Sequence, residues 1–579
     1  MTAGNGNGNG HAGAPGGDAG HRPAHHRGSP HRPVVEPRDR RTLVVRAVAL
    51  AAVAAVTGAI VLGPADGEPA AGPASLATAH AGALMPAVPP AASGSSTWYC
   101  AAGTAVPDGA ADHTVVMANG GDAPVTATLG VVPGDVRRPG APAAPQPGPV
   151  SREVELPARS RVEVRLGDVV AAPLAAAVVE ATGPGVAVEH RVSGPYGSDV
   201  APCAGSAAPT WHFAWGSTTR DARELVVLFN PFPSPATVDA TFTTEDGPRE
   251  PVRLQGFPIP ARSVVGVDLG DDVTRSEQVA ATFRARSGRV VVERVEQFDG
   301  SLGREGLTLG LGAPEAAGMW VFADGVASAA SSDPSAAPGG EGAAPTTTTT
   351  EDDEADEDDD EGPAATERIV VYNPGEERAR VTVELRPTSG PGEEAGPPPP
   401  PFRLTVGPGG YEVVDYGAQP RVVAGQPHAS VVRSTNGTGV VAERVTVDTG
   451  PPRRSGAVPG EVTASTGSRY GAEEWVFPTL ALGDGGVTSF AVFNPDPDRS
   501  VRVEVEAVTA AAGSTGSSVA RVPPGGRVEV PLDPDLAAAA GVVVRAGAPV
   551  VVERTVRRED GLRQAQGAGL PLLDVAAPL

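Results

Sequence analysis

The stretch Leu225-Val226-Val227-Leu228-Phe229-Asn230-Pro231 is an apolar, β-branched run that ends at an Asn-Pro pair. The same ending recurs at Val371-Tyr372-Asn373-Pro374 and at Val492-Phe493-Asn494-Pro495, and a weaker copy occurs at Val116-Met117-Ala118-Asn119-Gly120. After the first ten residues the chain has only five asparagines, and four of them occupy this one position. The pattern predicts a tandem array in which this asparagine has a structural role.

Other signals recur in a fixed order around the Asn-Pro strand. Each copy opens on a tryptophan, then comes the Asn-Pro strand, then a strand in which apolar and polar residues alternate, as in Val238-Asp239-Ala240-Thr241-Phe242. Alternation with period two indicates a half-buried strand. A Pro/Gly/Ser turn, a further strand and a closing hairpin that carries a glutamate complete the copy. The recurring residues are Trp98, Trp211, Trp320 and Trp475; Asn119, Asn230, Asn373 and Asn494; Glu189, Glu293, Glu443 and Glu553.

The spacing of these signals predicts the fold. Two of the three Trp-to-Trp intervals are about 110 residues, and the third is longer because of an insertion. About seven short strands in roughly 110 residues are typical of an immunoglobulin-like antiparallel β-sandwich. We therefore expect an all-β protein with four such modules. A β-propeller-like arrangement is the alternative, although propeller blades are shorter, near ~45 residues.

The composition divides the chain into seven segments. We predict a disordered basic tail, a transmembrane helix or signal anchor, an Ala/Pro/Gly linker and four modules, the third with a disordered Thr-rich and acidic insertion at 325–366. These segments are, in order, 1–41, 42–63, 64–96, 97–208, 209–317, 318–472 and 473–579.

The amino-terminal segment predicts the location of the protein. Seven arginines lie at or before Arg46, and an uncharged run follows from Ala47 to Gly63. With Thr42 to Arg46 added, the segment approaches the ~20 residues that a membrane-spanning helix needs. The positive-inside rule then places the amino terminus in the cytoplasm and the modules outside, in the cell envelope. Secretion after cleavage near Ala81 is an alternative, and Arg40-Arg41-Thr42-Leu43-Val44 partly resembles a twin-arginine signal.

Composition and charge exclude several classes of function. The chain has no lysine, which excludes a P-loop lysine and Schiff-base catalysis. The net charge of -24 argues against a nucleic-acid-binding surface, even though part of it comes from the run Glu351 to Glu361. That run has no EF-hand spacing, so we expect a solvated acidic tether and no specific metal. Thr346 to Thr350 are candidates for O-glycosylation.

The two cysteines, Cys100 and Cys203, are expected to form a disulfide, because both follow the predicted anchor and so lie in an oxidising compartment. Cys100 takes the place of Phe213, Phe322 and Phe477 in the other copies, a position that we expect to face the core. The first and last strands of a sandwich are often neighbours, which makes the bridge geometrically reasonable.

No catalytic constellation is apparent in the sequence. It contains no HExxH motif and no Gly-x-Ser-x-Gly elbow, and we nominate no catalytic residue and no cofactor. Because the glutamates recur in every copy, we expect them to have a structural role and to accept hydrogen bonds from a backbone N–H or an arginine. Trp215 is the one tryptophan outside the repeat, and it is a speculative sugar contact, although packing at a module junction is the more common role.

The openings Thr97-Trp98-Tyr99-Cys100 and Thr210-Trp211-His212-Phe213-Ala214-Trp215-Gly216 resemble a secreted repeat whose copies begin like T-W-Y-F-A-E-G, continue to an N-P strand and end near V-V-A-E-R. Together with the anchor, the chain resembles the uncharacterised actinobacterial family called domain of unknown function 5719, over residues 97–579. The first copy lacks the Asn-Pro, the third carries the insertion, and the fourth replaces the glycine that follows its Trp motif. The resemblance implies a location and a fold but no activity.

The sequence thus predicts a non-enzymatic, extracytoplasmic envelope protein that displays tandem modules for interaction with a protein or the cell surface. A carbohydrate-binding array for cell-wall or capsular glycan is the alternative, and it requires an exposed aromatic platform at Trp215. An envelope hydrolase or transferase is a third hypothesis, which would need two close carboxylates in a deep cleft.

Overall fold

The computed structural model describes residues 85–90, 93–107, 109–139, 145–326, 364–388, 398–449, 460–482, 486–509, 516–536, 539–572 and 577–578. The predicted tail (1–41), the predicted anchor (42–63), Thr346 to Thr350 and the acidic run lie outside these residues. Among the described residues, no helix is long and apolar enough to cross a membrane.

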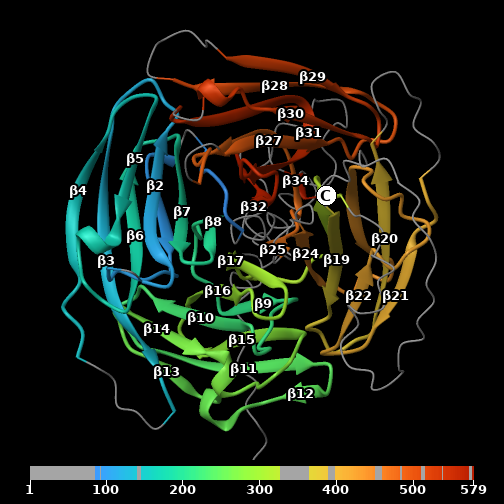
Figure 1. Cartoon of the computed structure of the whole chain (residues 1–579). Helices are drawn as coiled ribbons and strands as arrows, with labels where there is room; N and C mark the ends of the chain where they lie inside the picture. The colour runs from blue at the N-terminus through green and yellow to red at the C-terminus, as the bar shows by residue number, and fades with distance from the viewer. Residues whose placement is uncertain are drawn as a thin grey trace, which may run out of the picture. The chain divides into compact units, whose positions relative to one another are not determined.

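The prediction of an all-β protein is confirmed. The described strands form five sheets, none of which closes on itself, and the helices among the described residues are single 3-10 turns such as Leu166–Asp168 and Leu269–Asp271. The colour bar of Figure 1 follows the successive repeats from blue through green and yellow to red.

Each repeat contributes two antiparallel arrangements of four or more strands. In repeat 1 the first has the strand order β1-β6-β3-β4 and the second the order β5-β2-β7-β8. Their bounds are β1 Ser96–Cys100, β2 Asp112–Asn119, β3 Val125–Arg137, β4 Val150–Leu156, β5 Ser160–Arg165, β6 Leu174–Thr182, β7 Val186–Gly194 and β8 Gly197–Pro202.

Repeats 2 and 3 pair their strands in the same way. In repeat 2 the orders are β9-β15-β11, with β12 and β13 at the outer edge, and β14-β10-β16-β17. In repeat 3 they are β18-β23-β20-β21 and β22-β19-β24-β25. The bounds are β9 Thr210–Phe213, β10 Ala222–Asn230, β11 Ala236–Thr244, β12 Gly247–Arg249, β13 Phe257–Ile259, β14 Ser263–Asp268, β15 Val279–Ser287, β16 Val291–Asp299, β17 Arg304–Leu311, β18 Met319–Phe322, β19 Ala364–Tyr372, β20 Ala379–Pro387, β21 Phe402–Val406, β22 Tyr411–Asp415, β23 His428–Ser434, β24 Val441–Thr449 and β25 Gly460–Thr466.

In repeat 4 one long strand, β31, serves both arrangements. Its first half pairs with β26 and β28, and its second half pairs with β27 and β32. The remaining strands β29, β30, β33 and β34 pair with β28, β27, β26 and β26 respectively. The bounds are β26 Tyr470–Phe477, β27 Val487–Phe493, β28 Val501–Val508, β29 Ser517–Val522, β30 Arg527–Pro531, β31 Gly541–Arg557, β32 Arg563–Ala568, β33 Leu570–Pro571 and β34 Ala577–Pro578.

Alternating side chains of the strands build one hydrophobic cluster in each repeat. In β11 every second residue from Ala236 is buried, and the residues between are partly exposed. The cluster of each repeat includes its opening tryptophan, which is fully buried in all four copies. The indole N–H groups of Trp211, Trp320 and Trp475 donate to the carbonyls of Val290, Val440 and Val550, whereas that of Trp98 donates to the Ser96 hydroxyl. In repeats 2, 3 and 4 the indole N–H of the tryptophan therefore links the first strand to the closing hairpin.

The repeated asparagine holds two turns of its own repeat together. The Asn230 Nδ2 donates to the carbonyl oxygens of Ser234, Ile259 and Pro260, and its Oδ1 accepts from the Phe232 N–H. Asn119, Asn373 and Asn494 make the equivalent four hydrogen bonds. All four side chains are buried, so the amide satisfies backbone groups where the strands give way to the turns.

The last strands of the four repeats contact one another in a cycle. Strand β8 lies beside β17, β17 beside β25, β25 beside β32, and β32 beside β8 (Figure 1). In addition, β17 pairs with β25 and β14 pairs with β3, both in parallel. The repeats are therefore packed together, and the fourth repeat contacts the first.

One strand count and three expected boundaries differ from the structure. Each repeat has eight strands or more among its described residues, where about seven were predicted. Strand β19 begins at Ala364, inside the predicted insertion, because Ala364 to Thr366 extend the pairing with β24. Strand β26 begins at Tyr470, before the predicted start of module 4 at 473. The linker ends early: Ala87 and Val88 are buried, and Val88 forms a β-bridge with Leu572.

Candidate functional site

The repeated glutamate and the residue after it lie on strands β7, β16, β24 and β31. Successive side chains of a strand point to opposite sides of the sheet. The Glu-Arg pair (Glu-His in repeat 1) therefore reaches in two directions, and the structure shows that it contacts the repeat on either side. The four pairs are Glu189-His190, Glu293-Arg294, Glu443-Arg444 and Glu553-Arg554.

Each glutamate accepts backbone N–H groups from the loop after the opening Trp strand of the preceding repeat. Glu443 accepts from Ala214 (3.1 Å) and Trp215 (3.3 Å), and Glu553 accepts from Asp324 (2.9 Å). Glu293 accepts from Ala101 and Ala102, and Glu189 of repeat 1 accepts from Thr479 of repeat 4 (2.9 Å). The same contact thus joins repeats 1 and 2, 2 and 3, 3 and 4, and 4 and 1.

Three of the glutamates are also paired with a buried arginine of that preceding repeat, and the fourth, Glu293, faces His190. Arg294 lies 3.2 Å from Glu443, Arg444 lies 3.0 Å from Glu553, and Arg554 lies 2.9 Å from Glu189. Each of these arginines also donates to a backbone carbonyl of its own Trp loop and lies over the phenylalanine of that loop. Because burying an unpaired charge is costly, each pair depends on its partner being present.

Repeat 1 differs from the other three repeats at three residues, one of which is the buried arginine. The phenylalanine becomes Cys100, the glycine beneath the ring becomes Cys203, and the arginine becomes His190. In the other repeats a Cβ at Gly312, Gly467 or Gly569 would approach the phenylalanine ring to 2.9 Å or less, so ring and glycine fit together. The Cys100–Cys203 disulfide fills the same space, and this confirms the predicted disulfide.

The residue five positions after the opening tryptophan is a glycine in repeats 1, 2 and 3 but Leu480 in repeat 4, and its neighbour in space explains the difference. In repeats 1, 2 and 3 the side chain six residues before the asparagine is bulky: His113, Glu224 and Glu367. A Cβ at Gly103, Gly216 or Gly325 would approach these side chains to 2.5–2.8 Å, which requires glycine there. Repeat 4 has the smaller Thr488, which donates to the carbonyl of Leu480, the residue at the glycine position. The fourth copy therefore tolerates the departure from the repeat.

Repeat 2 holds a buried pair of carboxyl groups on neighbouring strands. Glu224 of β10 and Glu296 of β16 are cross-strand partners, and both are buried. Burial raises the pKa of Glu224 well above its usual range, and the charge of Glu296 adds to this; burial also raises the pKa of Glu296 to about 7, against the attraction of Arg294. The two carboxyl groups lie opposite each other and away from solvent. They are paired like the carboxyl groups of a glycosidase, but a substrate cannot reach them in this arrangement.

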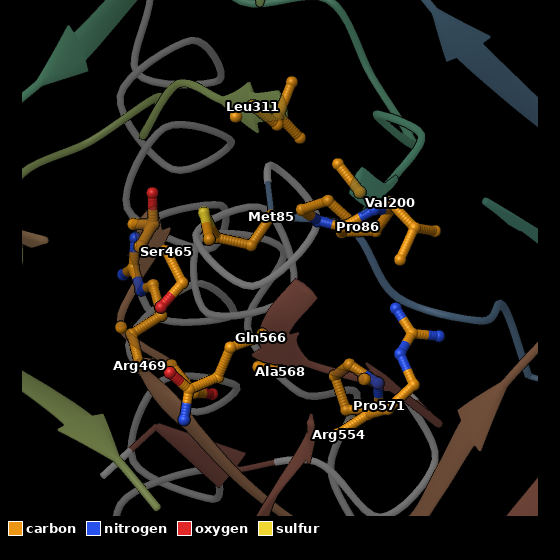
Figure 2. Close-up of a pocket in the computed structure, with 18 of the residues that line it drawn as sticks. Met85, Pro86, Val200, Leu311, Ser465, Arg469, Arg554, Gln566, Ala568 and Pro571 are labelled. Carbon is orange, nitrogen blue, oxygen red and sulfur yellow. The ribbon is translucent and has the colours of Figure 1, made fainter. Parts of the chain in front are cut away.

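A cavity of about 90 Å³ lies where the last strands of all four repeats meet. Figure 2 shows Met85 and Pro86 of the linker among side chains from each repeat. Its lining is mostly apolar and includes Val200, Leu311, Ser465, Gln566 and Pro571. Next to it, the Val88 N–H donates to the Pro571 carbonyl (2.9 Å). The linker and the carboxy-terminal strand thus meet at the junction of repeats 4 and 1.

Trp215 lies in the junction of repeats 2 and 3. It is 5% exposed, stacks on Phe298 with ring centroids 6.0 Å apart, and lies below the Arg294 guanidinium. An exposed aromatic platform, which the glycan-binding alternative requires, is not present at this residue. Within the described ranges, no group of three or more His, Cys, Asp or Glu side chains is placed to hold a metal ion.

The comparisons with known proteins add one match. The model of a family of unknown function (DUF5719) matches residues 196–397, which span the end of repeat 1, all of repeat 2 and the first strands of repeat 3. The match is shorter than the range 97–579 over which the openings and hairpin endings resemble the family. The comparison with curated proteins found no match.

Proposed function

We propose that the chain is a non-enzymatic, extracytoplasmic cell-envelope protein whose four modules form one scaffold for interaction with another envelope component. The observation that carries this proposal is the use of the repeated side chains. The tryptophans, asparagines and glutamates are all buried and bonded within the protein. They build a rigid body, and binding is left to its surface.

In this proposal each repeat is an immunoglobulin-like β-sandwich. Two four-stranded arrangements on one hydrophobic cluster support the sandwich. The cyclic contacts among β8, β17, β25 and β32 favour placing the four modules around one centre, as in the β-propeller-like alternative. The cycle of Glu–Arg contacts supports the same placement.

The proposal includes an actinobacterial origin and a single amino-terminal membrane helix with the modules outside the cytoplasm. Its support is the basic tail and apolar run of the sequence and the disulfide between Cys100 and Cys203, which suits an oxidising compartment. Release of the modules after cleavage near Ala81 is the alternative.

The test is co-sedimentation of the full chain with isolated envelopes of its source cells. One batch of envelopes is digested with protease and a second with glycan hydrolases before binding. We expect binding at moderate salt that is lost on the protease-treated envelopes, which identifies a protein partner. Binding that is lost only after glycan digestion would replace the proposal with a glycan-binding array. The proposal would be refuted if the chain binds neither batch of envelopes, or if the purified chain turns over a polysaccharide or a peptide.

A further inference from the structure

The junction of repeats 1 and 2 differs from the other three in the kind of cation it uses. Glu189, Glu443 and Glu553 face arginines, which stay charged at every pH that proteins tolerate. Glu293 instead faces His190, with 3.4 Å between the His190 Nε2 and the Glu293 Oε2. Histidine is the side chain whose charge changes around neutral pH.

The hydrogen bonds around His190 assign its proton positions. His113 Nδ1 lies 2.7 Å from the Ala175 carbonyl, which can only accept, so this nitrogen carries a proton. Burial lowers the pKa of His113 well below its usual value, and the charge of His190 adds to this, so His113 is neutral and its Nε2 accepts. His190 Nδ1 lies 2.9 Å from that Nε2 and therefore donates.

The second nitrogen of His190 faces a carboxylate. The Glu293 Oε2 accepts the N–H groups of Ala101 (2.9 Å) and Ala102 (2.6 Å), so this oxygen acts as an acceptor toward repeat 1. A neutral His190 would turn the lone pair of its Nε2 toward this carboxylate, and the lone pair and the carboxylate oxygen would repel each other. A proton on Nε2 removes that repulsion and makes His190 an imidazolium, the counterpart of the arginines at the other junctions.

The other groups near His190 do not supply a substitute charge. On its own strand, Glu189 is held by Arg554 of repeat 4, and Arg191 lies 3.2 Å from Glu163. On strand β2 the facing titratable group is His113, and on strand β8 the residue opposite is Ala201. The next residue on that face of β8 is Asp199, a buried carboxyl that accepts the N–H groups of Val200 and Leu309 and whose pKa burial raises to about 8; it supplies no cation for Glu293, and its own titration would persist in His190→Arg. The loop from repeat 1 that binds Glu293 begins at Cys100, whose sulfur is in the disulfide. All members of the His113–His190–Glu293 chain are fully buried.

We propose that the contact between repeats 1 and 2 is a proton-controlled seam: His190 holds Glu293 when it is protonated and releases it when it loses the proton. The other three junctions keep their arginines and do not respond. Alkaline conditions thus loosen one defined boundary of the scaffold, where the amides of Ala101 and Ala102 lose their acceptor. The inference stands on the contacts of the chain itself and is independent of what the scaffold binds.

The experiment follows single backbone amides of the full chain by hydrogen exchange at about pH 5.5 and about pH 8.5, corrected for the intrinsic rate. The Ala102 amide reports the seam, and the Thr479 amide, which donates to Glu189 beside Arg554, is the internal reference. We expect the protection of Ala102 to fall by about tenfold or more at the higher pH, relative to Thr479. In His190→Arg the fall should disappear.

A matched control is His212→Gln. Burial lowers the pKa of His212 to about 4, so this histidine is neutral throughout the range and its replacement should leave the pH response of Ala102 unchanged. Equal responses of Ala102 and Thr479 in the unchanged chain would overturn the proposal. If His190→Arg does not fold, the assigned ring ¹⁵N shifts of His190 in the unchanged chain decide, read separately from those of His428, which is also buried and lies 3.3 Å from Glu367. A His190 ring that is an imidazolium at about pH 5.5 and neutral at about pH 8.5 supports the seam, and a ring whose charge does not change between these pH values refutes it.

Discussion

Replacement of Glu443 tests the buried ion pairs that join the repeats. Glu443 is 1% exposed, pairs with Arg294 at 3.2 Å and accepts two backbone N–H groups of repeat 2. Glu443→Gln keeps the volume but removes the charge, so Arg294 is left buried beside Glu296 at 3.8 Å as its nearest remaining carboxylate. Removing one partner of a buried pair typically costs about 3–5 kcal/mol, and we expect a loss of unfolding free energy in this range.

The assay is urea denaturation of the full chain, with Glu412→Gln as the matched control. Glu412 is on strand β22 of the same sheet and is exposed, so its replacement should change stability by less than about 0.5 kcal/mol. The double variant Glu443→Gln/Arg294→Met should recover part of the loss, because it no longer buries an unpaired charge. A cost below about 1 kcal/mol for Glu443→Gln, or strict additivity in the double variant, would refute the reasoning.

Three further predictions concern the repeat, a buried carboxyl and the disulfide. Asn373→Ala should cost about 2–3 kcal/mol in thermal or urea unfolding, since it orphans three carbonyls and one N–H, whereas Asn436→Ala, at an exposed turn, should cost clearly less. Burial raises the pKa of Glu461 to about 7, so this group stabilises the fold below its unfolded pKa and that contribution is lost as the pH rises to about 7; Glu461→Gln should therefore be more stable than the unchanged chain at about pH 8 by about 3 kcal/mol and show no such gain at about pH 4. If Glu461→Gln and the unchanged chain were equally stable at both pH values, the raised pKa of Glu461 would be contradicted. Replacing both Cys100 and Cys203 with alanine should lower stability by about 4 kcal/mol in the chain-entropy model, because the bridge spans 103 residues, and calorimetry that detects no loss would contradict it.

The repeated local pattern made much of the fold predictable from the sequence. Alternation in stretches such as Val238 to Phe242 identified strands, and the scarcity of asparagine identified Asn230 and its equivalents as structural. The disulfide was predicted because both cysteines follow the predicted anchor, and the phenylalanine position of Cys100 indicated that this cysteine faces the core. These features are local or recur in all four repeats, so comparing the repeats with one another within this single sequence was enough to find them.

The partners of the repeated glutamate could not be assigned in the same way. A glutamate that is followed directly by an arginine suggests an ion pair between these two neighbours. In the structure, however, Glu443 pairs with Arg294 and not with Arg444. Neighbouring residues of a strand point to opposite sides, so the true partner comes from another repeat. The Gly312–Phe213 fit, which Cys203 and Cys100 replace, was also missed, although aligning the hairpin strands on their glutamates would have revealed it.

The burial of the linker had no signal in the sequence. Residues 64–96 are rich in Ala, Pro and Gly, which is typical of a spacer. Ala87 and Val88 are nevertheless buried, and Val88 is bonded to strand β33 of repeat 4, while the preceding Met85 and Pro86 line the cavity where the last strands of the four repeats meet. Such a site exists only after all four repeats have come together.

The closure of repeat 4 onto repeat 1 is the central claim about the scaffold, and the Thr479 amide tests it most directly. This N–H donates to Glu189, which lies 290 residues away in the chain. Hydrogen exchange at single-residue resolution should show Thr479 strongly protected in the unchanged full chain. Protection should be lost in Glu189→Leu, which removes the acceptor, while the Ala214 amide at the junction of repeats 2 and 3 stays protected. A Thr479 amide that exchanges at its intrinsic rate in the unchanged chain would contradict the closed cycle of repeats.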